Sequence, residues 1–63
     1  MTASEARVLA ARVWVAEGAI EARPKLRNLA ASLFDVGETA AGHAIRLELI
    51  QLETETPYGA PRG

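Results

Sequence analysis

The sequence predicts an all-α protein whose two helices form an antiparallel hairpin. Two segments of helical length flank Arg23-Pro24-Lys25, and proline ends a helix because it lacks an amide hydrogen and clashes with the preceding turn. In the second segment apolar residues recur at alternating steps of four and three, as in a helix that packs lengthwise on other helices. We therefore expect helices over about residues 3–22 and 24–53, in one domain that completes a bundle by oligomerising or by docking on a partner.

The first helix begins with a capping box. In Thr2-Ala3-Ser4-Glu5 the Thr2 hydroxyl can accept from the Glu5 amide, while the Glu5 side chain reaches back to the Thr2 amide. We interpret Gly18 as an interior helix residue that costs about 1 kcal/mol relative to alanine. A helical wheel gives this helix two apolar faces, which require two neighbours. One face holds Leu9, Val13, Ala16 and Ile20, and the other holds Val8, Ala11, Val15, Ala19 and Ala22.

The second helix is expected to begin at Pro24, where the missing amide hydrogen costs nothing. Its apolar stripe continues past Gly37 and Gly42 without a change of phase and therefore predicts one helix and not two. The stripe consists of Leu29, Leu33, Val36, Ala40, His43, Leu47 and Ile50. Two alternatives remain open: one long helix kinked at Pro24, and a break at Asp35-Val36-Gly37-Glu38 with a side-chain cap of its own.

The last ten residues differ in composition from the rest of the chain. Residues 54–63 contain two prolines and two glycines and cannot continue a helix. We expect a flexible tail there. The alternative is a docking peptide in which Pro57-Tyr58 inserts into a groove of a partner.

The length of the chain predicts that it needs a partner. A chain of 63 residues buries only about 60% of its unfolded surface, so its own core gives marginal stability. Disulfides are excluded because there is no cysteine. We therefore expect self-association, as a dimer or a higher form, or docking on a larger protein assembly.

Charge gives a weaker indication of partners. The net charge of −1 argues against a nucleic-acid binder, whose affinity must come from neutralising phosphates. Residues 1–31 hold five basic and three acidic residues, a net +2, whereas residues 32–63 hold two basic and five acidic residues, a net −3. This imbalance favours antiparallel pairing or self-association, although exposed ion pairs contribute only about 0–1 kcal/mol each.

No residues have the spacing of a catalytic, cofactor or metal site. His43 is the only histidine, and a general base needs an orienting acid and a reacting group within reach. We expect no enzyme activity, no cofactor, no metal and no small-molecule ligand. Since no apolar run approaches the roughly 20 residues of a membrane span, we expect a soluble, cytoplasmic protein without membrane contact.

Trp14 is the side chain that the sequence places apart from the rest. On the helical wheel it falls among Arg7, Glu17 and Glu21, and tryptophan is enriched among interface hot spots. We predict a contact with a partner, with packing inside the chain as the alternative. The residues predicted for the interface are Trp14, Val8, Val15, Leu29, Leu33, Val36, Ala40, Leu47 and Ile50.

These observations predict a small non-catalytic helical interaction protein, a structural, adaptor or regulatory component of a homo-oligomer or a larger complex. Two alternatives remain. One is an amphipathic module that lies on a membrane surface or in the groove of a partner. The other is an accessory subunit of an enzyme complex.

Overall fold

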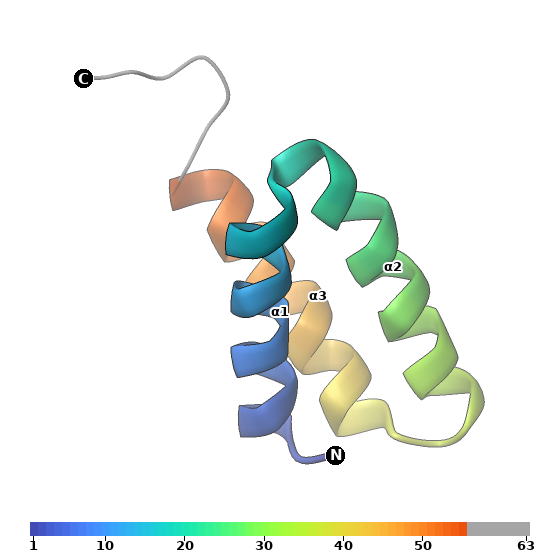
Figure 1. Cartoon of the computed structure of the whole chain (residues 1–63). Coiled ribbons are helices and arrows are strands. Elements are labelled where there is room, and N and C mark those ends of the chain that lie inside the picture. The colour runs from blue at the N-terminus through green and yellow to red at the C-terminus, as the bar shows by residue number, and fades with distance from the viewer. Residues whose placement is uncertain (56–63) are drawn as a thin grey trace.

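The computed structural model describes residues 1–55, which form three helices and not the predicted two. The helices are α1 (Ala3–Glu17), α2 (Ala19–Asp35) and α3 (Thr39–Glu55). Helices α1 and α3 run in the same direction. Helix α2 runs in the opposite direction and connects the end of α1 to the start of α3, so that the chain makes a three-helix bundle (Figure 1). The predicted two-helix hairpin is therefore wrong, because the chain turns twice, at Gly18 and around Gly37.

The start of α1 follows the sequence prediction. The Thr2 amide donates to Glu5 Oε1 at 2.9 Å, and the Glu5 amide donates to Thr2 Oγ1 at 3.1 Å. These two hydrogen bonds form the predicted capping box, which satisfies amides that no helical carbonyl can reach.

A single residue separates α1 from α2. Gly18 has φ 86° and ψ 159°, a conformation that is open almost only to glycine. Its amide donates to the Trp14 carbonyl at 2.9 Å, and its carbonyl accepts from the Ala22 amide at 2.9 Å. Gly18 thus ends one helix and begins the next, and its interpretation as an interior helix residue is wrong.

Pro24 lies inside α2 and makes neither the corner nor the start of a helix. An amide at position 24 would donate to the carbonyl of Ile20, a residue in the first turn of α2, but proline has no amide hydrogen. Only that one bond is lost, and tertiary packing of the rest of α2 can offset it. Both predicted boundaries at Pro24, near residues 22 and 24, are therefore displaced to Gly18.

The connection between α2 and α3 ends α2 with a Schellman motif. The Glu38 amide donates to the Leu33 carbonyl at 2.7 Å, the Gly37 amide donates to the Phe34 carbonyl at 3.1 Å, and Gly37 has φ 85°. The Gly42 amide then donates to the Glu38 carbonyl at 2.9 Å and opens α3. The alternative of a break within residues 35–38 is thus correct, although backbone groups and not a side-chain cap form it.

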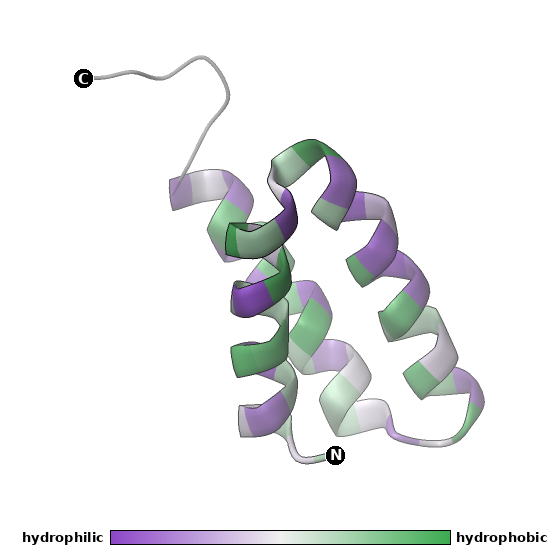
Figure 2. Cartoon of the chain, in the orientation of Figure 1, coloured by the Kyte–Doolittle hydropathy of each residue, from purple (hydrophilic) through white to green (hydrophobic). Residues whose placement is uncertain are grey.

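The core is made mostly of small side chains that let the helices approach closely. Hydrophobic and hydrophilic residues alternate along all three helices (Figure 2), and α3 packs against both α1 and α2. Leu26 and Ile45 are the largest side chains that are completely buried in the described chain. The core consists of Ala6, Ala10, Trp14, Ala22, Leu26, Ala30, Leu33, Ala41, Ala44, Ile45 and Leu49.

Ion pairs join the basic first half of the chain to the acidic α3. Arg7 Nε lies 3.4 Å from Glu48 Oε1, and Arg23 Nε donates to Glu53 Oε2 at 2.6 Å. These pairs connect α3 to α1 and to α2, in line with the uneven charge of the two halves of the sequence. Each is partly open to water and adds little to stability.

Helix α3 extends two residues beyond the predicted end at Glu53. The predicted flexible tail, and the alternative of a docking peptide at Pro57-Tyr58, fall on residues 56–63 and so lie outside the described residues. None of the helices in residues 1–55 is long and apolar enough to cross a membrane.

Candidate protein interface

The structure divides the predicted interface residues between the core and the surface. Trp14 and Leu33 are buried and Leu29 is half-buried, whereas the other predicted residues are exposed. The exposed ones are Val8, Val15, Val36, Ala40, Leu47 and Ile50.

Trp14 lies in the core and not on the outer face of α1. Its exposed fraction is 8%, and it follows Ala6 and Ala10 along the inner face of α1 at steps of four residues. Ala6 and Ala10 are themselves completely buried, so this line of residues marks the face of α1 that meets the other two helices. The predicted outer position of Trp14 is therefore wrong, and the alternative of packing inside the chain is correct.

The long apolar stripe of the sequence does not lie on one face of one helix. Its first part, Leu29 and Leu33, packs on the core from α2. The turn at Gly37 then changes the direction of the chain, and α3 buries a different face that contains Ala41, Ile45 and Leu49. The rest of the predicted stripe is left on the surface.

An exposed stripe consequently runs along α3. Leu47 is 63% exposed and Ile50 is 57% exposed. They continue the steps of three and four residues on which one face of a helix is built. We call this face the α3 stripe, and it comprises Ala40, His43, Leu47, Ile50 and Thr54, all of them exposed.

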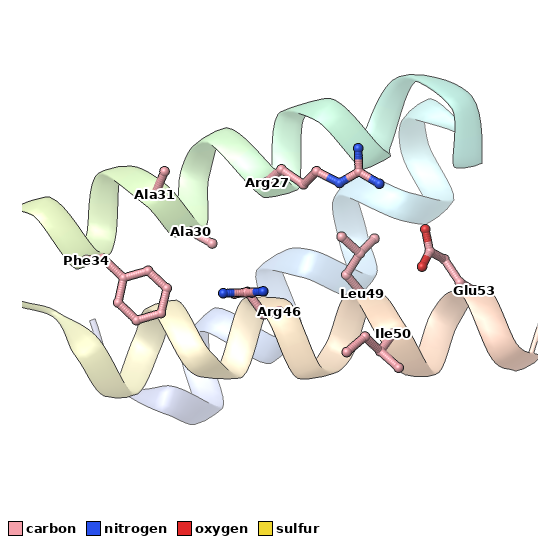
Figure 3. A pocket seen from close by; sticks show the side chains of 8 residues that line it. All are labelled: Arg27, Ala30, Ala31, Phe34, Arg46, Leu49, Ile50 and Glu53. Carbon is pink, nitrogen blue, oxygen red and sulfur yellow. The ribbon is translucent and has the colours of Figure 1, made fainter.

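A groove between α2 and α3 borders the α3 stripe. It has a volume of about 440 Å³ and includes Ile50, which belongs to both features. In Figure 3, Phe34 and Arg46 lie in the left half of the groove and Glu53 lies at its right end. The side chain of Arg27 extends along α2 toward Glu53. The groove is lined by Arg27, Ala30, Ala31, Phe34, Arg46, Leu49, Ile50 and Glu53.

Two cations in this groove lack an acidic partner within the described chain. Arg27 and Arg46 make no ion pair with any residue between 1 and 55, although Glu53, in the same groove, pairs with Arg23. Neither arginine was among the residues predicted for the interface. They belong to different helices and come to one groove only through the turn at Gly37.

His43 makes an aromatic contact at the edge of the α3 stripe. Its ring centroid lies 5.0 Å from that of Phe34, and the two ring planes are at 81°, an edge-to-face arrangement. His43 thereby joins α3 to Phe34 of α2, which lines the groove. In residues 1–55 no group of three or more His, Cys, Asp or Glu side chains could hold a metal ion.

A second exposed apolar face lies on α1. Val15 is 84% exposed, and Val8 is also exposed, with the half-buried Ala11 between them. Beside them Arg12 and Ala16 complete the lining of a shallow hollow of about 570 Å³. We call Val8, Ala11 and Val15 the α1 stripe.

Comparison of this chain with family models, with curated proteins and with solved structures found no match.

Proposed function

We propose that this chain is a non-catalytic helical interaction protein, a structural, adaptor or regulatory component of a homo-oligomer or a larger complex. The observation that carries the proposal is the α3 stripe, in which Leu47 and Ile50 are mostly exposed at the spacing of helix-to-helix contacts. Single exposed apolar side chains are normal on proteins. Aligned ones on a helix form a surface that a second helix can cover.

The bundle keeps this surface available because its own core uses other residues. Ala41, Ile45 and Leu49 fill the inner face of α3, and Leu47 and Ile50 do not belong to the core. Covering them would remove apolar area from water, worth about 25 cal/mol per Å² before the costs of association. The α1 stripe offers a second surface of the same kind for a larger assembly.

Photocrosslinking in cells of the native host tests this proposal. A photoreactive amino acid replaces Leu47 or Val15 in separate variants, and Asn28, an exposed polar residue of α2, serves as the control position. We expect protein crosslinks from Leu47, or from both stripe positions, and none from Asn28. Equal crosslinking at all three positions, or none at either stripe position, would show that the stripes are ordinary surface.

A further inference from the structure

We propose that two copies of this chain pair through their α3 stripes in antiparallel orientation, with Leu47 of each copy against Ile50 of the other. This inference rests on the proposed interaction function and names the partner as a second copy of the chain. It follows from three properties of the α3 stripe. These are the spacing of its residues, the charged residues beside it, and its position on the surface outside the core of the bundle.

The register follows from the spacing along α3. In the heptad notation Ala40, Leu47 and Thr54 take position a, and His43 and Ile50 take position d. Antiparallel helices pack a residues of one chain against d residues of the other. Placing Leu47 against Ile50 of the second copy puts two aliphatic layers at the centre. The same register puts His43 against Thr54 of the second copy at each end, where polar side chains can stay partly in water.

The flanking charges favour this same register. Arg46 and Glu53 occupy the positions that precede a, and such positions face each other across an antiparallel pair. With Leu47 against Ile50, Arg46 of each copy faces Glu53 of the other, and the two-fold symmetry makes the contact twice. In a parallel pair Arg46 would instead meet Gln51, and no such ion pair would form.

The observed contacts leave these groups able to pair. Arg46 has no ion pair within residues 1–55. Glu53 accepts from Arg23 through Oε2, and a carboxylate can accept several hydrogen bonds. Arg27 and Arg46 line the same groove beside Ile50 (Figure 3), so a carboxylate arriving from the second copy enters a region with two cations. A second copy therefore supplies apolar side chains to cover Leu47 and Ile50, and a carboxylate to pair with Arg46.

Only two aliphatic layers would be buried between the copies. We therefore expect a weak dimer with a dissociation constant of roughly 10 μM to 1 mM. Sedimentation equilibrium of the full chain, from micromolar to millimolar concentration, measures it. Leu47→Glu should raise the dissociation constant at least about tenfold, because it places a charge in a central layer. Val15→Glu introduces the same charge at an exposed valine of the α1 stripe and should change the dissociation constant less than about twofold.

A charge exchange tests the antiparallel register itself. Arg46→Glu alone and Glu53→Arg alone each place like charges at both flanking contacts, so each variant should dimerise more weakly than the wild type. An equimolar mixture of the two variants restores both opposite-charge contacts, and we expect it to dimerise at least about tenfold more tightly than either variant alone. Circular dichroism checks that each variant stays helical, since Glu53→Arg also removes a carboxylate that pairs with Arg23.

Three results would overturn the homodimer. The first is a wild-type chain that stays monomeric up to millimolar concentration. The second is a dimer that Val15→Glu dissociates but Leu47→Glu does not. The third is a mixture of Arg46→Glu and Glu53→Arg that dimerises no more tightly than either variant alone. A monomer that binds anionic lipid vesicles through Leu47 would identify a lipid surface as the occupant instead. The proposed interaction function fails separately, when neither stripe position gives crosslinks in cells.

Discussion

The ring of Phe34 lies against Gly42, so closely that a Cβ atom on Gly42 would come within 3.0 Å of three carbon atoms of that ring. Such a distance is tighter than nearly all real Cβ contacts. The absence of a side chain at Gly42 therefore lets α2 and α3 approach at the groove, and it seats the ring that also contacts His43.

We predict that Gly42→Ala changes stability in opposite directions with and without the Phe34 ring. In a Phe34→Ala background the ring atoms that lie nearest to the new methyl group are gone, so Gly42→Ala should stabilise α3 by about 1 kcal/mol through helix propensity. In the wild type the ring must move, and that gain should be cancelled or reversed. Urea unfolding of the four proteins gives the coupling energy. Equal effects in the two backgrounds would mean that Phe34 does not press on Gly42.

Gly18→Ala distinguishes the three-helix bundle from a long first helix. In a helix interior this substitution would stabilise the protein by about 1 kcal/mol. At φ 86° and ψ 159° it should instead destabilise the protein by about 1–3 kcal/mol, because a residue with a Cβ atom rarely adopts this conformation. The cost is one of backbone strain alone, since a Cβ atom there would have no neighbour within 4 Å.

Thermal unfolding followed by circular dichroism measures the effect of Gly18→Ala. Gly37→Ala is the matched control, because Gly37 also has positive φ and an open surrounding, and it should cost about 1–2 kcal/mol. An increase in stability on Gly18→Ala would contradict the turn between α1 and α2.

Pro24→Ala should stabilise the protein by about 1–2 kcal/mol. Alanine restores the amide that can bond to the Ile20 carbonyl and removes the clash of the proline ring with the preceding turn, and the greater freedom of the unfolded chain offsets part of this gain. The measurement is the free energy of unfolding in urea. If Pro24 instead made the corner of a hairpin, the substitution would weaken the connection, and a loss of stability would argue for that arrangement.

The three glycines within residues 1–55 explain why the number of helices could not be predicted from the sequence. Gly18 and Gly37 make turns, whereas Gly42 lies inside α3. The residues around Gly37 left a break open as an alternative, but nothing adjacent to Gly18 separates its role from that of Gly42. The apolar stripe also crossed Gly37 without a change of phase, because the exposed face of α3 happens to continue the spacing of the buried face of α2. The capping box at Thr2 was predictable because its two hydrogen bonds depend only on neighbouring residues.

The exposure of the predicted interface residues could be predicted in part for a similar reason. The helical wheel separated the exposed Val8 and Val15 from the partly buried Leu9 and Val13, because it depends on local geometry alone. It also grouped Ala22 with Val8 and Val15, and this was wrong, because Ala22 lies in α2 and is buried. Trp14 was placed on the wrong face, because a face marked only by the small side chains of Ala6 and Ala10 did not look apolar enough to be buried. Both alanines nevertheless line the core. The groove of Arg27 and Arg46 depends on how α2 and α3 meet, which a single sequence does not specify.

Leu33 and Leu47 provide a direct test of which leucines hold the fold together. Both were predicted to lie in one buried stripe, but Leu33 is 9% exposed and Leu47 is 63% exposed. Leu33→Ala should therefore cost about 2–5 kcal/mol, through lost burial and the cavity left behind. Leu47→Ala should change the stability of the monomer by less than about 0.5 kcal/mol, as at other surface positions. Unfolding is measured at low micromolar concentration, so that pairing through the α3 stripe does not contribute. Equal losses from the two substitutions would place Leu47 in the core and remove the α3 stripe from the surface.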